Sequence, residues 1–337
     1  MDLPLSFVYH TSWIATFLFG GWSFLITTFG MLVIVTQSKQ LGTFKYFLLN
    51  QTFWAMLFEL ANVLFRPVIM TPYLAMYLTG GLHKLVNYQT SIALTSIWAM
   101  LYVNAQLGTI ISLMNRFLFV FGPKISIFIK NKYTVFSFIV FHIFLHLGVA
   151  YYMYTITETP ELTRQHAHID SEGTLDLFFN ETSFFYCGQS NAMWKSWFFL
   201  DVVITSSLLS SIIYFIITVF IYKKKTIIVS KTSTSLLVSS LSQAFLNAIF
   251  FMMPALCALG AMGLQINGSA LTVNIVLELF HFHCTADMIC MLYCIVPYRK
   301  FCISLFHKVV KIENPRTSTV WHAVSMRANE HRSLNKF

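Results

Sequence analysis

Charged residues are scarce in this sequence. Only 10% of the 337 residues are Asp, Glu, Lys or Arg, while 56% are hydrophobic and 17% are aromatic. Soluble domains carry roughly 25% charged residues, and a soluble fold could not bury this much apolar surface. The scarcity of charge therefore excludes an ordinary soluble protein and predicts a membrane protein.

Metal-binding cysteine spacings and internal repeats are also lacking. The six cysteines include no pair of Cys-x2-Cys motifs, which excludes the common structural zinc modules. No internal repeat is visible, so an inverted-repeat transporter is not suggested. The N-terminal segment lacks the basic stretch of a signal peptide, and we expect the first apolar run to be a retained helix.

What the sequence does contain is seven long apolar stretches. Each is long enough for a membrane-spanning helix, which needs about 20 residues. Because backbone groups in lipid must pair within their own segment, we predict helices rather than open strands. The fold class is therefore an all-α membrane protein, a seven-transmembrane helix bundle over residues 1–297 with a tail over residues 298–337. The predicted spans are residues 13–36, 46–68, 91–120, 134–154, 197–222, 236–259 and 271–296.

The distribution of basic residues predicts the orientation of the bundle. With the N-terminus outside, 18 of the 22 Lys and Arg residues fall on the cytosolic side. The positive-inside rule therefore favours an outside N-terminus and a cytosolic C-terminus. The net charge of +9 arises mostly from this asymmetry. It indicates contact with the lipid bilayer and with a cytosolic partner, and no nucleic-acid partner.

The predicted outside loops carry further features of an extracellular surface. Glycosylation sequons begin at Asn180 and Asn267 in these loops, whereas a third at Asn50 lies within the second span and is expected to be inert. The loop over residues 155–196 holds six of the 13 acidic residues, which suits a solvated lid rather than a domain. Cys187 lies in this loop, and Cys257 is the cysteine best placed to pair with it.

Polar side chains inside the predicted spans are the candidate ligand contacts. Glu59 lies on the second span and Asn104 on the third, while Glu278 and His281 share a face of the seventh. Such groups bind ligands, connect a pocket to the cytosol, or join helices. All three interpretations are open for these residues, and for Glu59 we favour the connecting role.

Arg116 and two prolines are candidate switch residues. Arg116 is the only charged residue between Lys84 and Lys124, and an arginine at the end of a span either snorkels to the interface or lines a cleft that opens when helices move. Pro254 and Pro297 interrupt helical hydrogen bonding. Each is either a static kink or helix end, or a pivot for helix motion.

Histidines support a rival hypothesis, an intramembrane zinc hydrolase. His142 and His146 lie one turn apart on the fourth span. The seventh span adds His281, His283 and Asp287, and histidines with carboxylates can bind zinc and activate water. However, His281 and His283 are two residues apart and point to different faces of a helix. A transporter is a further alternative, but paired broken helices are not visible in the sequence.

Two short motifs resemble those of a known receptor family. Asn115-Arg116-Phe117 closes the third span, and Pro297-Tyr298-Arg299 follows the seventh. The second ending is typical of nematode serpentine chemoreceptors of the Str superfamily, including the Srh and Sri families. The second span, with Trp54, Glu59 and Pro67, is similar to the Srh pattern. Met114 stands where that pattern has an acidic residue.

The resemblance implies a G-protein-coupled chemosensory receptor, not an enzyme, that uses no cofactor or metal. A small molecule would enter from outside, between the outer halves of the helices. A heterotrimeric G protein would bind at a cytosolic cleft formed by Asn115, Arg116, Tyr298 and Arg299, with Pro254 and Pro297 as pivots. The expected location is the plasma membrane, with the sensory cilium as a candidate site.

The tail begins with an amphipathic pattern. Over residues 299–312, Phe301, Leu305, Phe306 and Val309 share one side, whereas the basic residues lie elsewhere. This pattern predicts a short helix that lies on the membrane surface, and Cys302 is a candidate for palmitoylation.

Overall fold

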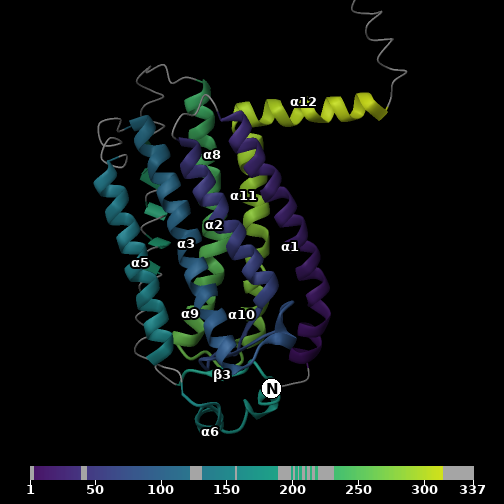
Figure 1. Cartoon of the computed structure of the whole chain (residues 1–337), viewed down its shortest axis with the longest axis vertical. Coiled ribbons are helices and arrows are strands. Elements are labelled where there is room, and N and C mark those ends of the chain that lie inside the picture. The colour runs from purple at the N-terminus through teal and green to yellow at the C-terminus, as the bar shows by residue number, and fades with distance from the viewer. Residues whose placement is uncertain are drawn as a thin grey trace, which may run out of the picture.

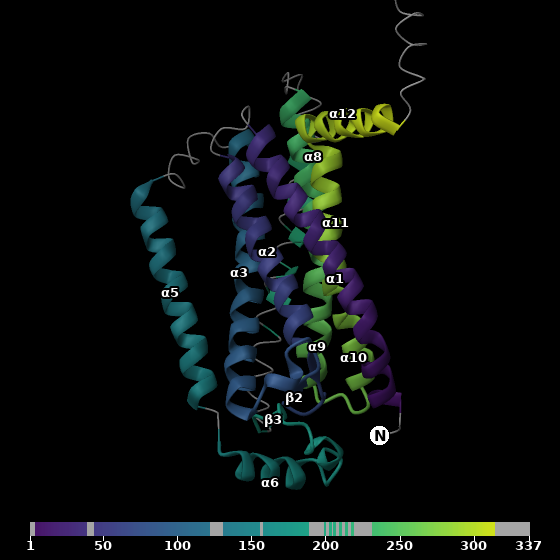
Figure 2. The same cartoon turned by 45° about the vertical axis from the view of Figure 1, so that its right-hand side comes forward.

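The protein forms a bundle of long helices with a small sheet at one end. The computed structural model describes residues 4–38, 44–121, 131–155, 158–188 and 231–313, together with isolated helical positions between 199 and 218. The long helices run side by side in both views (Figure 1, Figure 2). They are α1 Pro4–Gln37, α2 Phe44–Phe65, α3 Tyr88–Phe121, α5 Lys132–Thr155, α8 Lys231–Asn247, α9 Met253–Gly263, α10 Ala270–Leu277 and α11 Phe280–Cys294.

The helical membrane fold predicted from composition is confirmed. Five stretches of the described chain are long and apolar enough to cross a membrane by length and composition. They are Thr16–Gln37, Tyr88–Asn115, Lys132–Thr155, Val238–Gly263 and Ala270–Cys294. The 22-residue α2 is a helix as expected but is not among these five, and it carries the buried polar residues Gln51, Glu59 and Asn62. The predicted span over residues 197–222 lies mostly outside the described residues.

The helices α2, α3, α8 and α11 form the packed centre. The helix α2 packs between α1 and α3, and α11 contacts α1, α2 and α8. Close approach of α1 depends on two glycines. A side chain at Gly20 would overlap Val63 of α2, and one at Gly30 would overlap Met288 of α11. By contrast, α5 stands at the edge of the bundle beside α3 (Figure 2).

A three-stranded antiparallel sheet closes one end of the bundle. The strands are β1 Pro67–Ile69, β2 Ala75–Leu78 and β3 Phe185–Tyr186, in the order β1-β2-β3. Val68 pairs with Tyr77, and Met76 pairs with Phe185. We call the sheet, the helix α6 Pro160–Asp170, and the short helices η2 His83–Leu85 and η3 Asp176–Phe178 the cap. Figure 1 shows the cap at the end of the bundle where α1 begins.

The cap is more ordered than the solvated lid that we predicted for residues 155–196. Val68, Tyr77, Leu175 and Phe184 form a hydrophobic core within it. Thr159 caps α6 by accepting a hydrogen bond from the Leu162 backbone, and Pro160 occupies its first turn. The prediction missed this structure because strands of two to four residues are too short to show an alternating pattern.

Three of the differences between the helices and the predicted spans have a local cause. The helix α2 ends at Phe65 rather than at residue 68, since Pro67 disfavours a helical residue before it. The seventh span is divided between α10 and α11 at residues 278–279. The sixth contains a π-helix over Ala248–Met252 directly before Pro254, which lacks the N–H that regular helical pairing requires.

The helix α12 Val296–Glu313 lies across the other end of the bundle (Figure 1). Ile295 has an extended backbone that separates it from α11. Pro297 is the second residue of α12, a position where a missing N–H costs no helical hydrogen bond. Pro297 therefore begins a helix here rather than kinking one.

Candidate functional site

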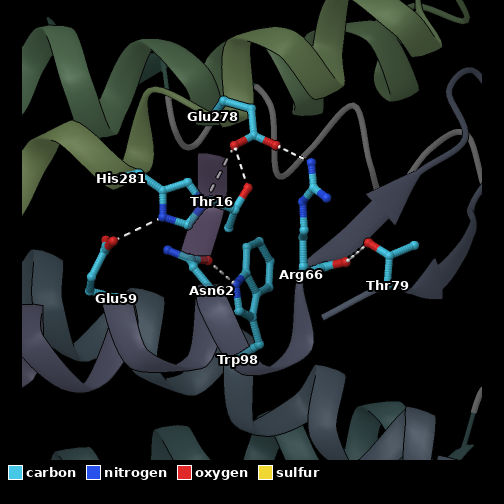
Figure 3. A network of polar contacts seen from close by, with 8 residues as sticks. All are labelled: Thr16, Glu59, Asn62, Arg66, Thr79, Trp98, Glu278 and His281. Atoms are coloured by element: carbon cyan, nitrogen blue, oxygen red, sulfur yellow. Dashed lines mark hydrogen bonds and ion pairs between the residues drawn. The ribbon is translucent and has the colours of Figure 1, made fainter. Parts of the chain in front are cut away.

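A network of polar side chains lies directly beneath the cap, and Figure 3 shows it from close by. It starts from Arg66, the residue directly after α2. The Arg66 N–H donates to the Asn62 carbonyl at 3.0 Å, and the Arg66 carbonyl accepts from both the backbone N–H and the hydroxyl of Thr79 at 3.1 Å. Arg66 has a left-handed backbone, with φ of 41°. Such a conformation is common at a helix end but is strained for a residue other than glycine.

The side chain of Arg66 turns back into the bundle and forms an ion pair with Glu278. The Nη2 to Oε1 distance is 2.8 Å, and the exposed fractions of the two side chains are 7% and 39%. The other Glu278 oxygen accepts from the Thr16 hydroxyl at 3.3 Å and lies 3.6 Å from Nε2 of His281. Glu278 therefore joins the end of α2 to α1 and to the seventh transmembrane segment (Figure 3).

The network continues through His281 to Glu59. The distance from His281 Nδ1 to Glu59 Oε1 is 2.9 Å, and both side chains are almost fully buried. Burying a charge in lipid is costly unless it is paired, so the pairing accounts for a carboxylate deep in α2. Within the described chain, Oε2 of Glu59 has no hydrogen-bond partner.

Two asparagines fix the walls around these ionisable groups. The Trp98 indole N–H donates to Oδ1 of Asn62 at 2.6 Å, which joins α3 to α2. Asn274 on α10 accepts from the Ile69 N–H at 3.0 Å and donates to the Ile69 carbonyl at 2.7 Å. These two bonds attach the strand β1 to the seventh transmembrane segment.

The network surrounds a small cavity of about 30 Å³. This is room for about one water molecule. The polar and aromatic residues that line it are Asn62, Arg66, Trp98, Asn274, Glu278 and His281. Phe280 also lines the cavity and belongs to a buried aromatic cluster with Phe58 and Phe251. The cavity therefore has polar groups on its lining, and Phe280 joins that lining to the aromatic cluster.

The aromatic interior reaches helix six at its irregular segment. Tyr102 and Phe251 stack with centroids 4.9 Å apart, and Phe58 packs 5.1 Å from Phe251. Phe251 lies within the π-helix and is 4.7 Å from the ring of His283 on α11. A displacement of the residues that line the cavity would therefore be transmitted to the π-helix through the packed aromatic rings.

The helical hydrogen bonding of the seventh transmembrane segment is irregular where the network lies. The backbone N–H groups of Leu279, His281 and Phe282 each bond to the carbonyl three residues earlier, at 3.1 to 3.2 Å. Such tight turns in a helix are weaker than regular α-helical pairing and often occur at hinges. Glu278 and His281 thus stand at a break in the seventh transmembrane segment.

The structure brings together three of the four predicted ligand contacts. Glu59, Glu278 and His281 meet in the network, whereas Asn104 lies elsewhere and contacts His146 of α5 at 2.9 Å. Sequence reasoning missed Arg66 and Trp98 as members of the site. The sequence did show a charged residue directly before Pro67, which could have drawn attention to Arg66. However, the direction of its side chain into the bundle depends on the cap.

Of the predicted switch residues, Asn115, Arg116, Pro297, Tyr298 and Arg299 lie toward the opposite end, whereas Pro254 stands in the first turn of α9. Tyr298 is fully buried, and its hydroxyl is 2.5 Å from that of Ser38. Asn115 is buried near the end of α3, and the Arg299 guanidinium lies 5.8 Å from the centre of the Tyr293 ring. Arg116 belongs to α3, but its side chain lies outside the described residues, so its role stays a prediction.

A further buried polar pair lies between these two ends. The Gln51 amide donates to Asp287 at 3.0 Å, which links α2 to α11. In addition, Asn247 donates to Gln106 at 3.3 Å, which links α8 to α3. These bonds hold the central helices together halfway along the bundle.

The cysteines and the glycosylation sequons of the predicted outside loops are not part of the polar network. Cys187 and Cys257 are both free in the structure. Burial, followed by the nearby charge of Glu158, raises the pKa of the Cys187 thiol to about 12. Asn180 and Asn267 are both exposed, so glycans at these positions stay a prediction that the structure permits.

Within the described ranges, the histidines and carboxylates do not gather into a group of three or more that could hold a metal. His146 contacts Asn104, and His281 contacts Glu59. The rings of His142 and His146 lie against each other at 5.8 Å.

The comparisons with known proteins agree with the motif resemblance. A family model described as serpentine type 7TM GPCR chemoreceptor Srh matches residues 10–308. The match spans the helical bundle, the cap and most of α12. A search of curated proteins finds no match.

Proposed function

The chain belongs to the Srh family of serpentine-type seven-transmembrane GPCR chemoreceptors, and on this premise we propose that it detects a small molecule from outside the cell and signals to a heterotrimeric G protein. The observation that carries the proposal is the polar cavity beneath the cap. Receptors of this kind need a site where binding changes the contacts between helices. Here one cavity borders α2, α3 and the broken seventh segment.

The distribution of basic residues supports an outside cap, where a ligand would enter, and a cytosolic α12 end, where a G protein would bind. Lys45, Lys132 and Lys231 lie at the starts of α2, α5 and α8 at the end where α12 lies, and Arg299 and Lys300 belong to α12 itself. The positive-inside rule therefore favours a cytosolic location for that end and an outside location for the cap. Both exposed sequons, Asn180 and Asn267, then lie on the cap side. The location that follows is the plasma membrane, with the sensory cilium as a candidate.

Signalling would pass through the irregular parts of helices six and seven. A ligand that favours one arrangement of Glu278 and His281 would shift the break at residues 278–279. The aromatic contacts of Phe251 would carry this shift to the π-helix of helix six. A cleft would then open at the α12 end, near Asn115, Arg116 and Tyr298, where the G protein binds.

The test is G-protein activation in membranes that contain the full-length receptor, over a panel of small volatile and water-soluble compounds. Arg116→Ala should abolish ligand-dependent activation at equal surface expression. Lys132→Ala, which changes an exposed basic residue at the same end, is the matched control and should respond like the parent. A panel that activates none of several G proteins through the parent receptor would contradict the proposal.

A further inference from the structure

The ion pair beneath the cap is asymmetric in a way that constrains the ligand. The Arg66 side chain is 7% exposed and the Glu278 side chain is 39% exposed. Arg66 is also held through its backbone, which bonds to Asn62 and Thr79. The Glu278 carboxylate is therefore the more accessible partner of the pair and is held by side-chain contacts alone, whereas the guanidinium is enclosed.

From this asymmetry we infer that the cavity recognises the carboxylate of a small organic acid, which replaces the Glu278 carboxylate on Arg66. The inference rests on the proposed receptor function and names the chemical class of its ligand. The exchange of one carboxylate for another leaves the net charge around Arg66 unchanged. A guanidinium is well matched to such a group, because it donates two parallel hydrogen bonds to a planar carboxylate.

The other ligand classes fit the site less well. A cationic ligand that approaches the more exposed Glu278 carboxylate would be repelled by the Arg66 guanidinium already paired with it, and Glu59 is 3% exposed and already paired with His281. An uncharged ligand that separates Arg66 from Glu278 would break a buried ion pair and offer no charge in exchange. Removing one partner of a buried ion pair is strongly unfavourable.

The size and lining of the cavity set the length of the acid. Its volume of about 30 Å³ holds little more than one water molecule, and withdrawal of the Glu278 carboxylate frees the place on Arg66 that the ligand carboxylate takes. Trp98 and Phe280 supply an apolar wall beside Arg66. The site therefore suits a carboxylate with a short alkyl chain, and butyrate sets the upper limit of the length tested.

Displacement of Glu278 has a direct structural consequence. Glu278 stands at the break between α10 and α11 and contacts Arg66, Thr16 and His281. When the ligand takes its place on Arg66, this break loses its link to α2 and α1. Binding is thereby coupled to the part of the seventh segment that is least regular.

The experiment compares butyrate with its uncharged analogues butyramide and butan-1-ol on the purified full-length receptor in lipid nanodiscs. The readouts are the ligand-dependent rise in the unfolding midpoint and, in parallel, G-protein activation. We expect butyrate to bind at least about tenfold more tightly than butyramide, since a charge-assisted hydrogen-bond pair is lost in the amide. Equal binding of the two compounds would overturn the inference.

Substitutions test the exchange directly. Glu278→Gln removes the internal competitor and should tighten butyrate binding by about tenfold, whereas Glu181→Gln, which changes an exposed carboxylate in the cap, should leave it unchanged. Arg66→Gln should abolish the preference for butyrate. If Arg66→Gln fails to fold, the Glu278→Gln result decides, and weaker butyrate binding by that variant would refute the exchange.

The two readouts separate this inference from the proposed function. Activation by uncharged compounds, with no selective binding of carboxylates, would support the receptor function and contradict the proposed ligand class. Selective butyrate binding without activation of any G protein would support the proposed ligand class and contradict the proposed signalling function.

Discussion

The two ends of the bundle differ in how far charged groups take part in joining the helices. Beneath the cap, charged and amide groups, among them Arg66, Glu278 and Asn274, join the helices in addition to apolar clusters such as that of Ile69, Ala258 and Val273. At the α12 end, Val33, Ile34, Leu48, Met291 and Tyr298 form an apolar cluster. A polar site can exchange one partner for another as a ligand enters, whereas an apolar cluster changes only by repacking. The difference suits ligand binding at the cap and a two-state rearrangement at the other end.

The largest effect is expected at the α12 end. Tyr298→Ala removes a fully buried ring and should lower the free energy of unfolding by about 4 kcal/mol because a cavity remains. Tyr298→Phe keeps the ring, loses the bond to Ser38, and should cost about 1 kcal/mol. Unfolding in mixed micelles measures both, with Tyr293→Ala as the exposed control. Equal losses for the Ala and Phe variants would show that packing does not dominate this end.

A somewhat smaller effect is expected from breaking the charged network. His281→Leu leaves the Glu59 carboxylate buried without its partner, and should cost about 3 kcal/mol in unfolding free energy. The double variant Glu59→Gln/His281→Leu should recover much of this loss, because no carboxylate is then left unpaired. If the double variant is no more stable than the single one, the two side chains are not coupled. His142→Leu on α5 serves as the control.

The next largest effect is expected where the cap sheet is attached to the seventh transmembrane segment. Asn274→Leu removes both hydrogen bonds to Ile69 and leaves that backbone unit unpaired, at a cost of about 2 kcal/mol. Faster amide hydrogen exchange in β1 and β2 should accompany the loss. Unchanged exchange in the two strands would show that the sheet is held independently of the seventh segment.

The smallest effect is expected in the cap helix. Thr159→Ala removes the N-cap of α6 and should cost about 1 kcal/mol, seen as faster exchange at the start of α6. Ligand-dependent signalling should persist, since Thr159 is not among the residues that line the cavity. Loss of signalling at normal surface expression would place α6 within the binding site.

The sequence predicts the helical membrane fold and the receptor family well, because long apolar runs and end motifs are local features. It also identifies Glu59, Glu278 and His281 as unusual, since charged groups are rare within spans. The pairing of Glu59 with His281 is not predictable in this way, because the rotation of α2 against α11 is set by packing of the whole bundle.

Arg66 shows a second limit of sequence reasoning. Next to Pro67, it is expected at the end of a helix and therefore in an outside loop. Its inward direction follows from a left-handed backbone and from the hairpin of β1 and β2. Strands of three and four residues give no periodic pattern, so neither the hairpin nor the cavity beneath it is visible in the sequence.

The measurement that tests the account most directly is ligand-dependent G-protein activation by the full-length receptor, with Glu278→Gln compared with the parent. The account predicts that a small molecule activates the parent and that Glu278→Gln shifts the concentration for half-maximal activation, while Glu181→Gln does not. Activation of parent and Glu278→Gln at the same concentration would contradict a binding site beneath the cap.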